Sequence, residues 1–593
     1  MAVLEWKPRQ RNYLQEIRSA SSASEEVQTH PLQGHTITVV DRADKKDKDR
    51  NSVNDGYLDP LSAFKVADPL SQFAAEADPL TSTAGNQTTP KGEKRPSKGA
   101  GSALKELDDS FEPWSSKRAG ILSKFTTSEK LTMMVSLTSA DKTQVGSKAA
   151  VTVTDKVKNR LEQLDDLEEG SVQEMLNLSQ QDYIHRIEEY NAALVAAWNQ
   201  DQKVKSLKIV IQCAKLLSDV SVIQFYPSKF VLITEILDTF GRLVFDRILS
   251  KSSSNGAQKG VKTLTENFTA DQIPESAKET CRNWFFKIAS IRELIPRFYV
   301  EAAILKCYAF LQTGEHNRAL VRLVEMTRGI GDPLVGVYAR CYLCRVGITI
   351  SPKFRDHLMP CFDDFIQMYS QIQTDGVQNV LAAQKLELSR YLVIYSPALD
   401  WILQCIANRS NEAVLDSVLG KCQAKCNRAL LHNSIILAFK PAFISGRAVE
   451  FANMIRECEE VGFPKHLLYR SLGLCVVAVS PPEDQRLTLL NDVWKAVTKL
   501  TNPSDYIGCA EVWIEYVLQL FGKRELNTFL ADIIKHMTPD RAYEDHYPQL
   551  QGIVSKILLH KKDLAELFGL DKFMAFIDMF QKESVKVSKT LTE

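Results

Sequence analysis

The sequence predicts an all-α protein, in which an α-solenoid of irregular helical hairpins follows a long, largely disordered N-terminal tail. Three observations lead to this fold class. The chain has 593 residues, which is too long for one ordinary core and favours several domains or a repeat array. From about residue 155 onward, apolar residues recur at helical spacing with little strand alternation. Prolines interrupt this pattern at intervals of roughly 15 to 40 residues, as expected for stacked hairpins of the HEAT-like type.

Changes in composition divide the chain into five segments. Residues 1–40 contain the alternating stretch HTITVV and are expected to form an extended belt. Residues 41–108 are rich in Ser, Asp, Lys, Pro and Gly, and they cannot bury enough apolar surface to offset their ordering entropy, so we predict a disordered linker. Residues 109–154 carry aromatic side chains and are expected to be partly ordered and to dock on the folded part. The α-solenoid is assigned to residues 155–580 and a disordered end to residues 581–593.

The linker contains the tripeptide Asp-Pro-Leu three times, and a fourth copy stands at residues 332–334. In the fourth copy, Asp332 is predicted to be a helix N-cap and Pro333 the first helical residue. The tail copies carry the same start signal, but only about two helical turns follow, which are marginal in water. They are either nascent helices that order in a groove of a partner or degenerate linker sequence. The residues of these possible short linear motifs are Asp59, Pro60, Leu61, Phe64, Asp68, Pro69, Leu70 and Phe73.

Within the solenoid, the first helix is expected over residues 172–201, where apolar residues have helical spacing. The polar stretch 250–276 is interpreted as a long loop between helices. Many of the prolines are expected to open a new helix, because the missing N–H costs nothing in the first turn. The predicted breaks are at Pro227, Pro274, Pro296, Pro333, Pro352, Pro397, Pro441, Pro464, Pro503 and Pro539.

Composition and motifs argue against several classes of function. A formal net charge of zero disfavours nucleic acid as the main ligand. No apolar run reaches the roughly 18 residues of a membrane helix, and the first residues lack a secretory signal, so twelve cysteines are expected to be buried thiols in a reducing compartment. The pair Cys341 and Cys344 lies in an apolar helical run and is interpreted as packing. His432 is interpreted as a core histidine. We therefore predict no enzyme activity and no catalytic, cofactor or metal site.

Four stretches resemble the family of large α-solenoid scaffold subunits of the retriever complex, paralogues of the large subunit of retromer. These stretches are residues 201–241, 279–302, 463–474 and 537–551. The second one contains a sequence similar to the PRLYL-type motif of that family, with Phe and Val in place of the two leucines. The residues of this motif are Pro296, Arg297, Phe298, Tyr299 and Val300.

The resemblance implies a scaffold for endosomal cargo recycling, in the cytoplasm and peripheral to endosomes, that supports the return of membrane proteins to the cell surface. It implies that residues 296–300 bind an arrestin-like subunit, and that Pro31 and Leu32 of the belt bind a phosphoesterase-fold subunit. A PX-FERM sorting nexin as cargo adaptor and a COMM-domain and coiled-coil assembly are the other implied partners. It also implies that this chain is a C-terminally shortened form.

Two alternatives stay open from the residues themselves. The chain could instead be a generic helical-repeat adaptor, of the nuclear transport or phosphatase scaffold type. At residues 296–300, Arg and Tyr are favoured at interface hot spots, which favours a binding role; the alternative is that Phe298 and Tyr299 only pack between repeats.

Overall fold

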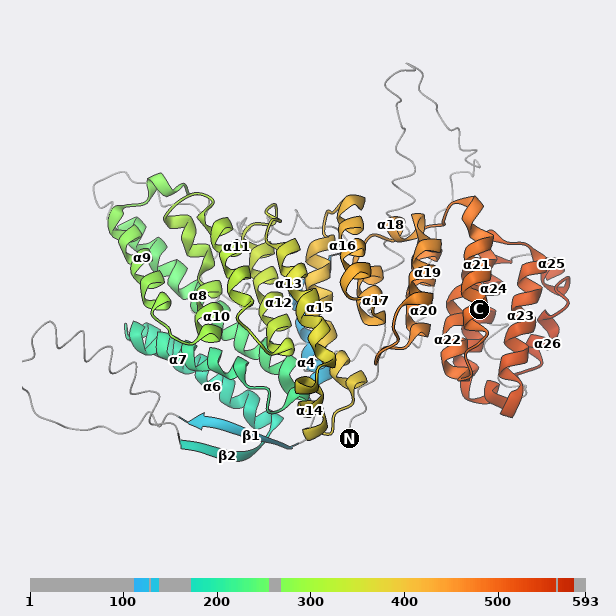
Figure 1. Ribbon diagram of the computed structural model, residues 1–593, viewed down its shortest axis with the longest axis horizontal. Helices are drawn as coiled ribbons and strands as arrows, with labels where there is room; N and C mark the ends of the chain where they lie inside the picture. Colours follow the sequence, from blue (N-terminus) through green and yellow to red (C-terminus); the bar gives the residue numbers. More distant parts are fainter. Residues whose placement is uncertain (1–110, 127–129, 138–171, 255–267, 562–563, 581–593) are drawn as a thin grey trace, which may run out of the picture. The chain divides into compact units, whose positions relative to one another are not determined.

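The fold is known from a computed structural model, which describes residues 111–126, 130–137, 172–254, 268–561 and 564–580 (Figure 1). The described residues fall into two units. The first unit comprises residues 116–406, and the second comprises residues 407–580 together with 111–115. Both units are built from stacked helices, which confirms the predicted all-α solenoid.

In the first unit, helices pack against their neighbours in sequence and against the next helix but one. For example, α10 contacts α8, α9, α11 and α12 as well as the earlier α7. The elements, with η denoting a 3-10 helix, are α4 (Trp114–Phe125), β1 (Lys130–Leu137), β2 (Val172–Ser179), α6 (Gln180–Asn199), α7 (Lys203–Lys215), η2 (Leu216–Ser218), η3 (Ile223–Phe225), α8 (Tyr226–Ser254), η4 (Ala270–Gln272), α9 (Glu275–Ala289), α10 (Leu294–Ala303), η5 (Leu305–Phe310), α11 (Glu315–Thr327), α12 (Pro333–Ile350), α13 (Leu358–Ser370), η6 (Gln371–Gln373), α14 (Asp375–Ala383) and α15 (Leu388–Ala407).

The second unit repeats the same packing rule. Its helix α20 contacts both α17 and α22, and α22 contacts both α20 and α24. The α20–α22 contact is close because Gly473 has no side chain: a Cβ there would lie 2.8 Å from Trp513 Nε1. The elements are α16 (Glu412–Lys425), α17 (Ala429–Ala438), α18 (Pro441–Gly446), α19 (Ala448–Glu457), α20 (Lys465–Ala478), α21 (Glu483–Val497), α22 (Pro503–Leu520), α23 (Lys523–Met537), η7 (Pro539–His546), α24 (Tyr547–His560), α25 (Leu564–Phe568) and α26 (Phe573–Ile577).

Local capping determines where several helices begin, and the sequence predicts this for α12. Asp332 is the N-cap of α12, and Pro333 is its first residue. Asn502 caps α22 in the same way, with its side chain accepting a hydrogen bond from the Ser504 N–H at 3.0 Å. Pro333, Pro441 and Pro503 open α12, α18 and α22, where proline loses no intrahelical hydrogen bond.

The prediction of a helix break at Pro397 is wrong, because this proline lies inside α15. Its ring nitrogen cannot donate to the carbonyl four residues earlier, that of Val393. The hydroxyl of Ser396 donates to that carbonyl instead, at 3.2 Å. The flanking helix is almost entirely buried, so tertiary packing also holds it together through the proline. Pro296 does not begin its helix either, since α10 starts two residues earlier, at Leu294.

The helix expected from residue 172 begins only at Gln180. Residues Val172–Ser179 form strand β2, which pairs with β1 in an antiparallel two-stranded sheet. The register places Lys130 opposite Ser179 and Leu137 opposite Val172. The apolar residues of this stretch fit both the spacing of a helix and the alternation of a strand. Pairing with a strand that is distant in sequence selects the strand.

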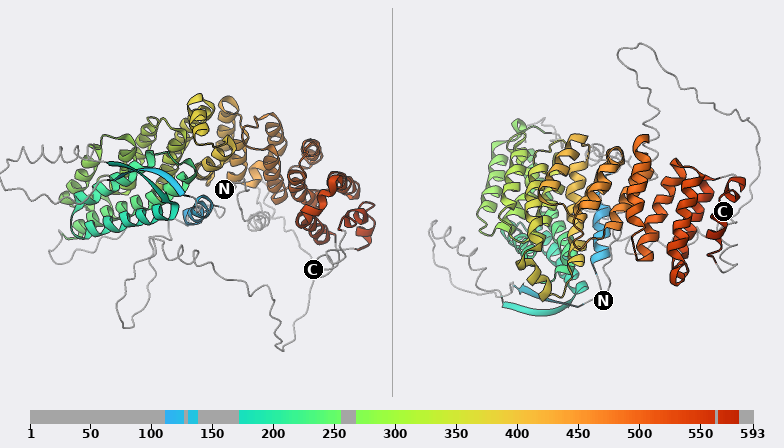
Figure 2. Two further views of the ribbon diagram at one scale, coloured as in Figure 1. Left: turned by 90° about the horizontal axis from the view of Figure 1, so that it is seen from below. Right: turned by 45° about the vertical axis from the view of Figure 1, so that its right-hand side comes forward.

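Helix α4, drawn in blue in Figure 2, packs on the first unit. It makes both apolar and charged contacts there. Ile121 and Phe125 are buried, with 4% and 2% of their surfaces exposed. Arg118 pairs with Glu235 on α8, and Lys117 Nζ lies 3.6 Å from Asp400 Oδ2 on α15. The segment that carries Trp114 therefore supplies a helix to the solenoid core.

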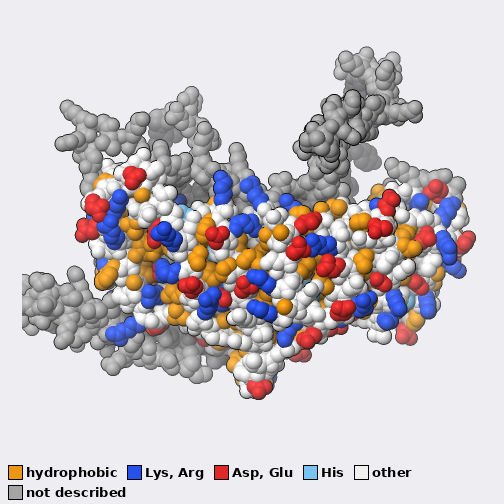
Figure 3. All heavy atoms as spheres, turned by 45° about the horizontal axis from the view of Figure 1, so that its top comes forward, with side chains coloured by type: hydrophobic (Ala, Val, Ile, Leu, Met, Phe, Trp, Pro, Cys, Tyr) orange, Lys and Arg blue, Asp and Glu red, His pale blue; other side chains and the backbone are white. Residues whose placement is uncertain are grey.

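The described surface mixes charges of both signs. On the face shown in Figure 3, basic and acidic side chains alternate over both units, with apolar side chains between them. This agrees with equal numbers of Lys plus Arg and Asp plus Glu, 73 each, in the whole sequence. No helix in the described part of the chain is long and apolar enough to cross a membrane.

Candidate functional site

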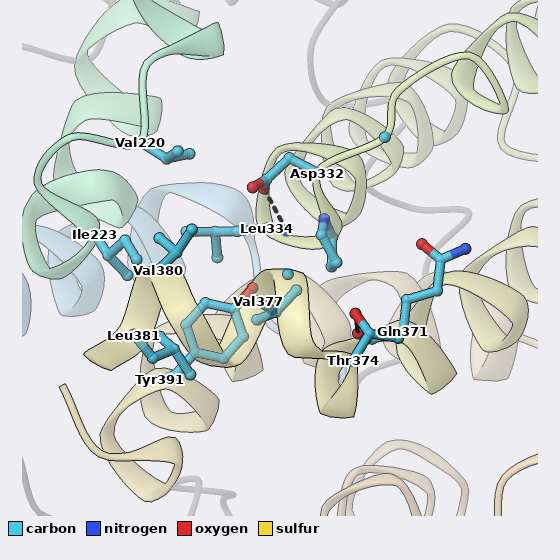
Figure 4. Close-up of a pocket in the computed structure, with 13 residues that line it drawn as sticks. Val220, Ile223, Asp332, Leu334, Gln371, Thr374, Val377, Val380, Leu381 and Tyr391 are labelled. Atoms are coloured by element: carbon cyan, nitrogen blue, oxygen red, sulfur yellow. Dashed lines mark hydrogen bonds between the residues drawn. The ribbon is translucent and has the colours of Figure 1, made fainter. Parts of the chain in front are cut away.

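A pocket of about 270 Å³ opens in the first unit where α12 begins (Figure 4). We call it the α12 pocket. The connection between α7 and α8 forms one wall, and η6, α14 and α15 form the others. Its lining mixes aliphatic side chains with polar groups and consists of Val220, Ile223, Gly331, Asp332, Pro333, Leu334, Gln371, Thr374, Gly376, Val377, Val380, Leu381 and Tyr391.

Asp332 is the only charged residue in this lining. Its Oδ1 atom accepts hydrogen bonds from the N–H groups of Leu334 and Val335, both at 2.9 Å. Its Oδ2 atom accepts no hydrogen bond from any residue that the structure describes. Burial raises the pKa of Asp332, and the two backbone hydrogen bonds oppose that rise. In Figure 4, apolar side chains of the pocket separate this carboxylate from the ring of Tyr391.

The wall between α7 and α8 is fixed by two polar side chains from other elements. Gln384 accepts a hydrogen bond from the Ile223 N–H at 3.2 Å and donates one to the Val220 carbonyl at 3.0 Å. The ammonium group of Lys229, on the buried side of α8, donates to both the carbonyl and the carboxylate of Asp219. The wall therefore keeps its shape without a ligand.

The motif at residues 296–300 lies on α10, but most of it faces the core. Pro296 is buried, and Phe298, Tyr299 and Val300 are each 0% exposed. The ring of Tyr299 packs against Tyr342 on α12, with ring centroids 5.3 Å apart. These four residues fix the position of α10, and their side chains are not available on the surface.

Arg297 is the exception in the motif. Its side chain is half-buried, and its buried Nε atom finds no hydrogen-bond acceptor within the described part of the chain. It forms no ion pair with any residue in the described ranges. Two other arginines of this unit differ, because the exposed Arg322 pairs with Glu301 and the buried Arg345 pairs with Asp238. The positive charge of Arg297 is thus not compensated by any acidic side chain that the structure describes.

Buried tyrosines of α8, α10 and α12 lie in the core of the first unit. Tyr226 on α8 packs against Tyr338 on α12, with centroids 5.3 Å apart, and the Tyr338 hydroxyl donates to the Ile394 carbonyl at 2.8 Å. Burial raises the pKa of Tyr226, and the charges of Tyr299 and Asp332 raise it further. Helix α10, which carries the motif, and helix α12, which begins at the pocket, therefore belong to the same core.

The residues interpreted as packing do pack. All twelve cysteines are buried free thiols, and burial raises the pKa of Cys341 to about 12. His432 is 0% exposed, and its Nε2 atom lies 2.7 Å from Asn427 Oδ1. Burial lowers the pKa of His432 to about 4, so it is neutral in the fold. Among the described residues, no three His, Cys, Asp or Glu side chains converge in a way that could hold a metal ion.

The remaining predicted sites lie outside the described residues. These are Pro31 and Leu32 of the belt and the three Asp-Pro-Leu copies at residues 59–80. Conversely, sequence reasoning did not identify the α14 side of the α12 pocket, including Val377, Val380 and Gln384. The only local signal was the helix start at Asp332.

Two family models match the chain: one described as VPS35L over residues 113–394, and one described as VPS35L C-terminal domain over residues 410–592. Among curated proteins, "VPS35 endosomal protein-sorting factor-like" of Mus musculus is 51% identical over 599 residues, covering 99% of this chain and 60% of that protein. The Homo sapiens protein of the same name is 51% identical over 598 residues, with the same coverage. The Drosophila melanogaster relative is 40% identical over 594 residues, again covering 99% and 60%. This chain spans about 60% of the length of these relatives.

Proposed function

Because the chain belongs to the VPS35L family, we propose that it is a non-enzymatic scaffold for the sorting of endosomal membrane proteins. The observation that carries this proposal is the match to both family models, which cover residues 113–394 and 410–592. The printed name of the curated relatives, an endosomal protein-sorting factor-like protein, supplies the process. A helical solenoid suits a scaffold because it exposes long faces on a linear core.

Within this role, we propose that α10 supports the contact with an arrestin-like subunit of a retriever-type complex. Arg297 supplies the specific contact, since it is the one motif residue that is not fully buried and it has no described ion-pair partner. A carboxylate of the partner would form an ion pair with the guanidinium group of Arg297. The desolvated, charge-assisted hydrogen bond would strengthen binding. Phe298, Tyr299 and Val300 act indirectly, by holding α10 in the core.

The other proposed contacts rest on the resemblance. Pro31 and Leu32 would bind a phosphoesterase-fold subunit, a COMM-domain and coiled-coil assembly would join the complex, and a PX-FERM sorting nexin would present cargo. The complex would act peripherally on endosomes, from the cytoplasm, and return membrane proteins to the cell surface. The second candidate function is a generic helical-repeat adaptor, which the stacked helices alone would equally support.

Affinity purification of the full chain with charge-reversed variants tests the proposal. The parent chain should recover an arrestin-fold protein and COMM-domain proteins, whereas importin-type cargo would favour the generic adaptor. Arg297→Glu should lose the arrestin-fold protein while circular dichroism stays helical. Arg318→Glu is the matched control, because Arg318 lies on the exposed face of the neighbouring α11 and pairs with Glu315, at 3.5 Å. Retention of the arrestin-fold protein by Arg297→Glu would reject the assignment of α10.

A further inference from the structure

We propose that the α12 pocket binds one basic side chain, an arginine or a lysine, from an extended segment of a partner protein. This inference goes beyond the scaffold function and does not depend on the contact of Arg297. It rests on the size of the pocket, its aliphatic walls, its single carboxylate and the rigidity of its rim.

The size of the pocket selects for a side chain over a whole small molecule. Its volume is about 270 Å³, which lies below the roughly 300–1,000 Å³ that is usual for ligand and cofactor sites. One long side chain with part of its backbone fits such a volume. Recognition of a peptide anchor is therefore the better match.

The walls suit the hydrocarbon stem of a basic residue. Leu334, the second residue of α12, lines the pocket together with Val377 and Val380 of α14 (Figure 4). Val380 is 42% exposed, so the aliphatic surface extends to the mouth of the pocket. Lys and Arg bury their methylene stems against surfaces of this kind and keep the charged head in a polar environment.

The polar environment for the head is the carboxylate of Asp332. Its Oδ1 atom is occupied by the two backbone N–H groups of α12, and its Oδ2 atom is left for a ligand. No cationic residue lines the pocket to compete for it. A guanidinium or ammonium group at Oδ2 would make a charge-assisted hydrogen bond.

The site is already formed before a ligand arrives. Gln384 holds the backbone of Val220 and Ile223, and Lys229 holds Asp219 next to them. Binding then requires little loss of conformational entropy in the protein. A shallow site can therefore still discriminate between ligands. Charge complementarity at a fixed carboxylate predicts selection for a cation over a neutral side chain of the same shape.

Saturation-transfer NMR on the full chain tests this inference with N-acetyl-arginine amide and its uncharged isostere N-acetyl-citrulline amide as probes. The arginine probe should bind with a dissociation constant on the order of 1 mM, as expected for about 4 kcal/mol from one side chain. Asp332→Asn should weaken its binding at least tenfold, whereas the fold should survive because Asn is an equally good N-cap. Val380→Trp, which fills the mouth, should also abolish the signal.

The matched control is Asp375→Asn, which removes an exposed carboxylate at the start of α14 but does not alter the pocket lining. It should leave binding of the arginine probe unchanged. Equal binding of the arginine and citrulline probes would overturn the proposal. So would unchanged binding by Asp332→Asn, or the absence of any arginine signal in the parent chain at about ten times the expected dissociation constant.

Discussion

The buried ammonium group of Lys229 lies 3.4 Å from the carboxylate of Asp219, and it also donates a hydrogen bond to the carbonyl of the same residue. The side chain of Lys229 is 0% exposed and that of Asp219 is 32% exposed. Burial lowers the pKa of Lys229, and Asp219 opposes this by stabilising the charged form. The pair thus fixes the turn that forms one wall of the α12 pocket.

Removing one partner of this pair should destabilise the first unit. Breaking a fully buried ion pair costs about 3–5 kcal/mol, and partial exposure of Asp219 lowers the expected loss for Asp219→Ala to about 2–3 kcal/mol. Amide hydrogen exchange in α8 measures this loss without assuming that the two units unfold together. The double variant Lys229→Met with Asp219→Ala should lose less than Asp219→Ala, because no buried charge is left unpaired. A larger loss in the double variant would contradict this account.

The stability of the first unit should fall at acid pH because of His357. Its ring is 1% exposed and stacks on Phe354, and neither ring nitrogen has a hydrogen-bond partner among the residues that the structure describes. Burial lowers its pKa from 6.5 to about 4, and the positive charge of Arg355 adds to this. Below pH 6.5 the unfolded chain takes up a proton that the folded chain excludes. Stability is therefore complete above pH 6.5 and falls by about 3 kcal/mol as pH drops to 4.

Thermal unfolding of the parent and of His357→Leu at pH 7.5 and pH 5 checks this prediction. The leucine variant should lose less of its midpoint temperature on acidification than the parent does. Phe354→Leu is the control, since it removes the stacked ring but keeps the titrating group. It should lower stability at both pH values and keep the pH dependence. Parallel curves for the parent and His357→Leu would argue against a buried neutral histidine.

The sequence predicted the starts of α12, α18 and α22, because the causes of these starts are local. Asp332 and Asn502 cap N–H groups two or three residues later, and each is followed directly by a proline. Both signals therefore lie within a few consecutive residues. Pro397 shows the limit of this reasoning. The hydroxyl of Ser396 and the buried surface of α15 maintain a helix that the local rule would end.

The candidate site was predictable only in part, because it is assembled from distant segments. The motif singled out Arg297, but its missing ion pair becomes visible only when the packed neighbours are known. The α12 pocket joins Val220, Asp332 and Val380, which are separated by up to about 160 residues. No local pattern relates these positions, since tertiary packing brings them together.

Docking of α4 should depend on a few residues. Phe125 is 2% exposed, and Arg118 pairs with Glu235 on α8. Phe125→Ala should cost about 3 kcal/mol or more, as for other buried aromatic residues. Amide exchange in α4 should then become much faster, whereas α12 keeps its protection. Ser123→Ala, at an exposed position of the same helix, should change neither. Uniform loss of protection in the first unit would show that α4 is part of its cooperative core.

Close approach of α8 and α10 should make Gly241 intolerant of any side chain. A Cβ at this position would clash with the carbonyl oxygen of Ala303, the last residue of α10. Because a backbone atom cannot move aside cheaply, Gly241→Ala should force the two helices apart and cost about 1–3 kcal/mol or more. If α10 presents Arg297 to an arrestin-like partner, the same variant should also weaken that binding.

The control for this substitution is Gly420→Ala on α16, where an added Cβ meets nothing within 4 Å. Alanine is the better helix former by about 0.5–1 kcal/mol, so this variant should be slightly more stable than the parent. The two glycine substitutions, identical in chemistry, are thus predicted to shift the midpoint of thermal unfolding in opposite directions. A stabilising effect of Gly241→Ala would mean that α8 and α10 are not in backbone contact, and it would remove the reason for a glycine there.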